Sequence, residues 1–168
     1  MKKIFLLLMA VVVAGCGYST RSLLPEHYRT VFVPPFENKI NYMAQDTRQV
    51  YIPGLETRVR EAIVDRYLFD GNLHVVPQDE ASLVLKGQLL AFEREELRLD
   101  QNEGVKEYRI RVIVALTLWD PATKETVWQE PSFAGEATYY TADPESAAID
   151  AALKDLALRV VARTVENW

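Results

Sequence analysis

The chain has 168 residues, of which 49% are apolar, and its formal net charge is −5. This length suits a single domain whose core can form without a disulfide. The acidic balance argues against a nucleic-acid binder that works by attraction to phosphates, and the one cysteine excludes an internal disulfide framework or a cysteine-cluster metal site. The two histidines, His27 and His74, leave little for zinc binding or histidine-based catalysis.

The N-terminal segment predicts a cleaved secretion signal. Lys2 and Lys3 precede an apolar run, residues 4–14, which as a helix would reach only about 16 Å, well short of the roughly 30 Å hydrocarbon core of a membrane. The run ends at Val-Ala-Gly-Cys, residues 13–16, which resembles the lipobox of bacterial lipoproteins. The resemblance implies cleavage before Cys16, a diacylglyceryl group on its thiol and an acyl chain on its new amine. The alternative is an ordinary secreted protein with a buried cysteine.

The same resemblance sets the expected location and division of the chain. Lipid on Cys16 would anchor the chain permanently, and Gly17, in place of an aspartate that would favour the inner membrane, favours the outer membrane. Loss of the two leading lysines would bring the net charge to −7. We expect residues 1–15 to be the signal peptide, residues 16–29 a lipidated tether and residues 30–168 a single domain.

The first strand is predicted at residues 30–33, where Pro34 and Pro35 stop it. Residues 36–52 then show no clear period, and a connection of this length is often a contact loop. A surface loop without a partner is the equally open alternative. The candidate partner-binding side chains of this loop are Tyr42, Met43 and Tyr51.

A helix is predicted from residue 55 to about residue 69. Gly71 lies just beyond it and can end a helix because glycine readily adopts the left-handed conformation. Apolar residues share one face of this helix, namely Leu55, Val59, Ala62, Ile63 and Tyr67. A short strand at residues 73–76 and a longer one at residues 83–97 follow, with a hairpin turn at residues 102–104.

The clearest strand covers residues 107–119, because apolar and other residues alternate along it without interruption. After a turn at residues 120–123 the chain returns through residues 126–141, where Pro131 could break the strand. The last helix begins near residue 145 and continues almost to residue 168. Its apolar stripe consists of Ile149, Ala152, Leu153, Leu156, Val160 and Thr164.

This order of elements predicts an α+β two-layer sandwich. The crossover through the first helix should make its two strands parallel, whereas the later meander is antiparallel, so the sheet is mixed. We expect about four strands, with both helices on one face of the sheet.

Two groups of charged residues are candidate sites. Glu93, Glu95 and Glu96 could act as paired carboxylates in acid–base chemistry, although a charged strand end explains them more simply. The second group is cationic and could bind an amphiphile that carries phosphates, if its members share the sheet face that the helices leave open. Cross-strand pairing with glutamates is the alternative. The cations are Arg94, Arg98, Lys106, Arg109 and Arg111.

Ordered motifs along the chain resemble the LptE family of lipopolysaccharide-assembly lipoproteins. They are Cys-Gly-Tyr-Ser at residues 16–19, Val-Pro-Pro-Phe-Glu-Asn-Lys at 33–39, Pro-Gly-Leu-Glu at 53–56, Leu-Val-Leu-Lys-Gly at 83–87, Glu-Tyr-Arg-Ile at 107–110 and the hairpin at 118–128. The stretch between residues 39 and 53 looks longer than in many members.

The resemblance implies a function without catalysis. A domain tethered in the outer membrane, facing the periplasm and the barrel lumen, would plug the β-barrel protein LptD and deliver lipopolysaccharide. The implied partners are therefore the barrel, lipopolysaccharide and the membrane, with no cofactor apart from the lipid on Cys16, no metal and no nucleic acid. The alternative is an outer-membrane lipoprotein that activates a cell-wall synthase or serves a secretion system.

Overall fold

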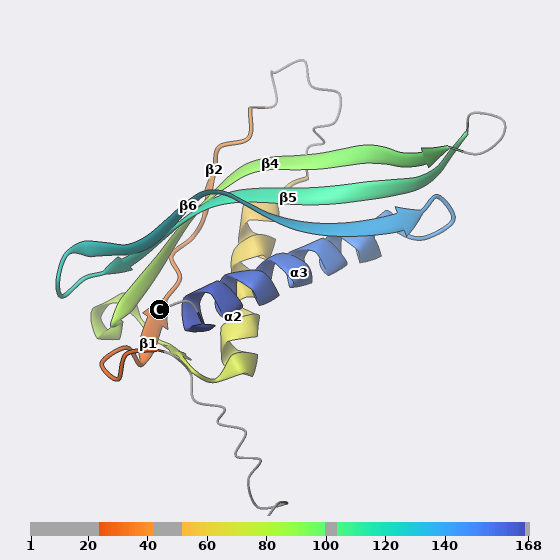
Figure 1. Cartoon of the computed structure of the whole chain (residues 1–168). Helices are drawn as coiled ribbons and strands as arrows, with labels where there is room; N and C mark the ends of the chain where they lie inside the picture. The colour runs from red at the N-terminus through yellow and green to blue at the C-terminus, as the bar shows by residue number, and fades with distance from the viewer. Residues whose placement is uncertain (1–23, 42–51, 100–103, 167–168) are drawn as a thin grey trace, which may run out of the picture.

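The computed structural model describes residues 24–41, 52–99 and 104–166. The β-sheet forms a long curved arm, and two helices lie beneath it (Figure 1). In chain order the elements are β1 (Thr30–Phe32), β2 (Glu37–Asn38), α2 (Leu55–Asp70), β3 (His74–Val75), a 3-10 turn (Gln78–Glu80), β4 (Leu83–Leu99), β5 (Val105–Asp120), β6 (Glu125–Tyr140) and α3 (Glu145–Glu166).

The sheet is mixed, as predicted. Its strands lie in the order β3-β1-β4-β5-β6, and β2 pairs with β4 off this path. β1 runs parallel to β3 and β4, whereas β4, β5 and β6 form an antiparallel meander. The expected count of about four strands is corrected to six. The strand predicted at residues 73–76 is present as the two-residue β3, and β2, which was not predicted, also pairs with the sheet.

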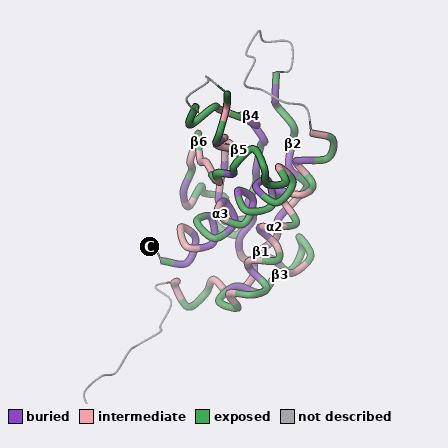
Figure 2. Tube along the Cα trace, turned by 90° about the vertical axis from the view of Figure 1, so that its right-hand side faces the viewer, coloured by how far each residue is buried: buried purple, intermediate pink, exposed green. Residues whose placement is uncertain are grey.

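Both helices cover the same face of the sheet, which confirms the two-layer α+β architecture. The residues that are buried gather where the helices and the strands face one another (Figure 2). The largest fully buried ones are Tyr67, Phe92, Leu55, Ile63, Leu73, Leu83, Leu85, Leu89, Ile110, Leu116, Leu118 and Leu156.

The periodic patterns of the sequence account for the two helices. Four of the five apolar positions predicted for α2 are buried, and only Ala62 stays half-exposed. Gly71 ends α2 with a φ of 76°, and its N–H donates to the Tyr67 carbonyl at 3.0 Å. All six residues of the predicted α3 stripe are buried.

Two irregular places differ from the sequence prediction. The first is the start of the expected loop at residues 36–52, where β2 pairs with β4 and Phe36 is buried. Phe36 packs directly over Gly87 of β4, where a Cβ would overlap its ring, so the missing side chain creates the space. The second is Pro131, which does not break β6 but lies at a register shift between Val114 and Leu116, as expected for a bulge in an edge strand.

Candidate functional site: the open face of the sheet

The face of β4, β5 and β6 away from the helices carries charged side chains at its centre. The register places Glu93 opposite Arg111 and Glu95 opposite Arg109. Arg109 donates from Nη2 to Glu95 at 2.7 Å, and Arg111 donates from Nη1 to Glu93 at 3.1 Å. Directly opposed residues of antiparallel strands share a face, so these four side chains form two cross-strand ion pairs.

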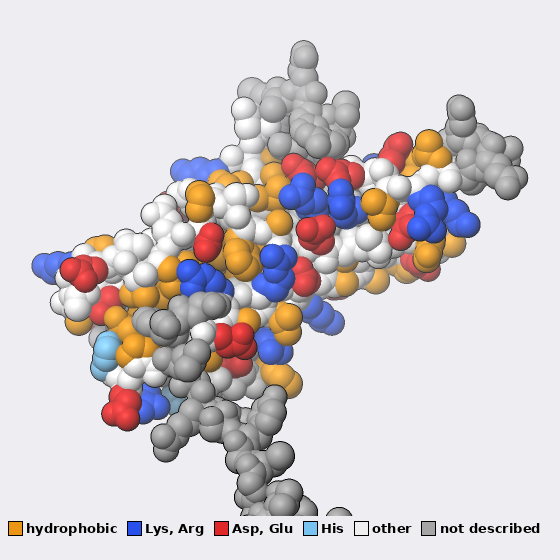
Figure 3. Space-filling model, in the orientation of Figure 1, with side chains coloured by type: hydrophobic (Ala, Val, Ile, Leu, Met, Phe, Trp, Pro, Cys, Tyr) orange, Lys and Arg blue, Asp and Glu red, His pale blue; other side chains and the backbone are white. Residues whose placement is uncertain are grey.

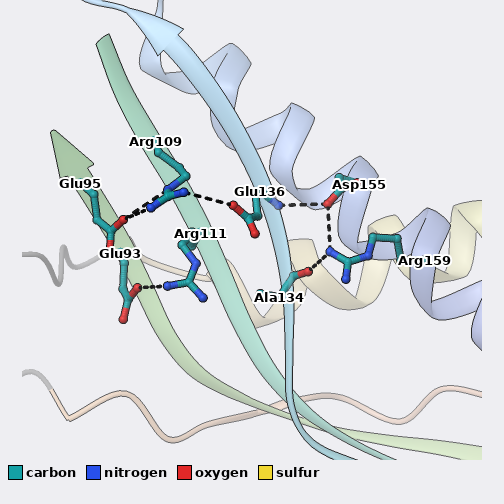
Figure 4. Close-up of polar contacts among 8 residues, drawn as sticks. All are labelled: Glu93, Glu95, Arg109, Arg111, Ala134, Glu136, Asp155 and Arg159. Carbon is teal, nitrogen blue, oxygen red and sulfur yellow. Dashed lines mark hydrogen bonds and ion pairs between the residues drawn. The ribbon is translucent and has the colours of Figure 1, made fainter. Parts of the chain in front are cut away.

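Further polar contacts lead from these ion pairs across β6 to α3 (Figure 4). Arg109 also lies 4.0 Å from Glu136, whose backbone N–H donates to Asp155 at 3.0 Å. One turn further along α3, Arg159 donates to the Ala134 carbonyl at 2.6 Å. Asp155 and Arg159 thereby satisfy backbone groups on the outer edge of β6, which would otherwise be open to pairing with another strand.

The open face does not collect all five predicted cations. Arg94 lies opposite Ile110 and projects from the helix-covered face, where it contacts Glu145 of α3 at 3.3 Å. Lys106 belongs to that same face by alternation along β5. A register shift between Glu96 and Arg98 brings Arg98 opposite Glu107, so Arg98, Arg109 and Arg111 share the open face. The expectation of one five-cation patch is therefore corrected by the register.

The electrostatics of the open face are those of paired charges. Its three arginines meet four carboxylates, those of Glu93, Glu95, Glu107 and Glu136. The hydrogen bond to Glu95 raises the pKa of Arg109 above its ordinary value, although desolvation opposes the shift. Positive and negative side chains alternate on the visible surface of the arm (Figure 3). Cross-strand pairing, the alternative left open by the sequence, is thus present, and a phosphate would have to compete with these glutamates.

The glutamate group does not form an acid–base site in this arrangement. Glu93 and Glu95 pair with arginines, whereas Glu96 lies opposite Tyr108 on the other face. His74 is exposed in β3, and His27 packs against Tyr28 with ring centroids 4.0 Å apart. In the described residues no group of three or more His, Cys, Asp or Glu side chains could hold a metal ion.

A partly buried polar contact that the sequence did not predict joins Tyr28, near the start of the described residues, to the β5–β6 turn. The Tyr28 hydroxyl donates to Asp120 at 2.8 Å, and Asp120 also accepts from the backbone N–H groups of Ala122 and Thr123. Burial, with help from Asp120, raises the pKa of Tyr28 to about 12, so the hydroxyl remains a donor. Tyr28 and Asp120 are 92 residues apart in sequence, so no local sequence pattern could predict their contact.

Several predicted site residues lie outside the described part of the chain. They are the lipid-attachment candidate Cys16 and the loop residues Tyr42, Met43 and Tyr51. Their roles remain predictions. Among the helices that the structure describes, none is long and apolar enough to cross a membrane.

The comparison with family models identifies one match. The LptE model, described as Lipopolysaccharide-assembly, matches residues 28–164 and so covers nearly all of the described domain. No curated protein matches this chain in sequence.

Solved structures share the fold at low sequence identity. The hypothetical protein CT253 from Chlamydia trachomatis is 13% identical, with a TM-score of 0.55 over 82% of this chain and 95% of that chain. Protein XCC0632 from Xanthomonas campestris is 12% identical, with a TM-score of 0.54 over 84% and 88% of the two chains. The PelC dodecamer from Paraburkholderia phytofirmans is 14% identical, with a TM-score of 0.52 over 89% and 96%. At such identities the similarity shows the fold alone.

Proposed function

Because the chain belongs to the LptE family, we propose that it is a non-enzymatic lipoprotein subunit of lipopolysaccharide assembly at the outer membrane. The match across residues 28–164 is the observation that carries this proposal. In it, lipid on Cys16 anchors the chain, and the domain faces the periplasm and the lumen of an LptD barrel as a plug. The chain itself catalyses no reaction.

The open face of the sheet suits such a partner. The interior of a large outer-membrane barrel is polar, so a plug must present polar groups without leaving unpaired charge at the contact. Arg109 and Arg111 are already paired with glutamates across the strands, and the outer edge of β6 is covered at its centre by Asp155 and Arg159. These contacts favour docking through side chains over the addition of a strand at that edge.

Purification of the full chain from detergent-extracted outer membranes should recover a large β-barrel protein in a one-to-one complex. The expected readouts are the mass of the complex and crosslinks from Tyr42 or Tyr51 to the barrel. A ring of identical chains without any barrel would instead support the secretion-system alternative, and reproducible absence of a barrel would contradict the proposed plug.

We also propose that the open face contacts lipopolysaccharide directly. In that case, removal of a positive charge and removal of a negative charge from this face should have opposite effects on binding. Arg109→Gln and Arg111→Gln should weaken lipopolysaccharide binding several-fold, because each removes a cation that can bind phosphate. Glu93→Gln and Glu95→Gln should strengthen it, because they free those cations from their present partners. Binding of lipopolysaccharide to the purified mature chain is the measurement.

The matched control for this series is Arg58→Gln. Arg58 pairs with Asp150 at 2.8 Å between the two helices, away from the open face. Its substitution should therefore leave lipopolysaccharide binding unchanged. Each substitution changes a partly exposed ion pair, so the free energy of unfolding should fall by no more than about 1 kcal/mol. If the arginine and glutamate variants bind as the wild type does, these residues do not contact lipopolysaccharide.

A further inference from the structure

Two neighbouring apolar side chains at the C-terminal end of α2 face solvent. Phe69 is 80% exposed and Leu68 is 63% exposed, the largest exposures among the big apolar side chains that the structure describes. Single exposed apolar residues are ordinary, but an adjacent pair that protrudes from a helix end resembles the surfaces with which proteins contact apolar partners.

A cation accompanies this pair. The Arg66 guanidinium carbon lies 5.1 Å from the centroid of the Phe69 ring. Within the described residues its buried Nε has no hydrogen-bond partner. An aromatic ring beside an arginine suits the boundary between lipid headgroups and acyl chains, where the ring enters the apolar layer and the guanidinium can meet phosphates.

The apolar surface extends from the helix end into a groove between α2 and α3. The groove has a volume of about 640 Å³ and is lined on its apolar side by Ala62, Leu153, Ala157, Leu158 and Phe69. Its charged rim includes Arg58 and Asp150, which pair with each other. Phe69 is therefore part of the lining of this groove, where apolar side chains lie among charged ones that also include Glu61, Asp65 and Lys154.

The position of this surface is set by the start of the chain. β3 follows α2 after three residues and pairs with β1, where His74 donates its backbone N–H to the Arg29 carbonyl at 2.9 Å. The C-terminal end of α2 thus lies at the same end of the domain as β1 (Figure 1). Eight peptide units separate Cys16 from Leu24, the first described residue, and span at most about 28 Å.

We propose that Leu68 and Phe69 insert into the interface of the lipid membrane that carries the Cys16 anchor and so hold the domain in one orientation. This inference rests on the proposed lipid anchor. A short tether keeps the β1 end of the domain near the membrane, and this pair is the most exposed apolar feature at that end. The exposed Leu97, Leu99 and Tyr140 lie toward the opposite end of the strands, away from the anchor.

The test places a spin label at residue 69. Full-length Phe69→Cys is produced with its signal, and after acylation of Cys16 the new cysteine is the sole free thiol available to a nitroxide label. The labelled chain is reconstituted into phosphatidylethanolamine–phosphatidylglycerol vesicles. We expect collisions with oxygen, which concentrates in the hydrocarbon, to exceed collisions with a water-soluble nickel chelate several-fold. Leu68→Cys should report the same environment and serves as the second variant.

Tyr140→Cys is the matched control, because Tyr140 is 48% exposed and lies at the far end of β6. Its label should collide mainly with the nickel chelate. An equal ratio of collisions at residues 69 and 140 would overturn the inference. Protection of residue 69 from both reagents only when a barrel protein is present would also overturn it, in favour of a protein contact.

The wild type distinguishes failure of the proposed lipid anchor from failure of Leu68 and Phe69 to enter the membrane. Uptake of nitroxide by the wild type would mean that Cys16 is not acylated, which removes the anchor proposed above and this inference with it. A water-exposed label at residue 69 in a chain whose mass shows acylation would overturn this inference alone.

Discussion

Replacement of Gly135 by alanine is expected to lower the free energy of unfolding by about 1–3 kcal/mol, because α3 packs directly on the backbone of β6 at this residue. A Cβ on residue 135 would lie 2.5 Å from the Ala152 carbonyl oxygen and 2.7 Å from the Leu156 backbone nitrogen. These are atoms of the helix backbone and cannot turn aside as a side-chain end can. The helix would have to move away from the sheet, and its buried stripe would lose close packing.

Chemical denaturation of Gly135→Ala and of the wild type measures this loss. Ala134→Val is the matched control, since Ala134 lies next to Gly135 on the open face and the added methyl groups meet no helix there. The control should change stability by no more than about 0.5 kcal/mol. Equal stability of Gly135→Ala and the wild type would mean that α3 does not sit as close to β6 as the structure places it.

The sequence predicts the regular elements of this fold well because burial repeats along them. In α3, for example, the buried residues of the predicted stripe recur about one helical turn apart, and in β5 buried residues recur at every second position. β2 could not be predicted in this way, because two paired residues give no period. Its position depends on the packing of the Phe36 ring against Gly87, which is a contact between residues distant in sequence.

The candidate site could be predicted only in part, since the missing information is register. Arg109 and Arg111 share a face because they are two residues apart in one strand. Whether Arg94 and Arg98 join them depends on the alignment of β4 with β5, and a bulge near Leu97 brings Arg98 to the open face but leaves Arg94 on the other. The same register places Glu93 and Glu95, which the sequence offered as a possible catalytic pair, beside Arg111 and Arg109, with which they form ion pairs.

The buried carboxylate of Asp120 should make the stability of the domain depend on acid pH. Asp120 is 3% exposed and connects Tyr28 with the β5–β6 turn. Burial works against its ionisation, yet the hydrogen bonds from Tyr28 and from the backbone of Ala122 and Thr123 hold its pKa below the ordinary value of 3.8. Hydrogen bonds to a charged acceptor are stronger than those between neutral groups.

Asp120→Ala removes the acceptor shared by these donors and is expected to lower the free energy of unfolding at pH 7 by about 2–3 kcal/mol.

Because the pKa of Asp120 is lower in the folded state than in the unfolded state, its ionised form stabilises the fold fully above about pH 4 and progressively less as the pH falls further. The difference between wild type and Asp120→Ala should therefore shrink between about pH 4 and pH 2. Denaturant unfolding across this range is the measurement, with Glu125→Ala as the control, since Glu125 is an exposed carboxylate at the same turn. A difference that stays constant down to pH 2 would show that the charge of Asp120 contributes nothing and that only its packing does.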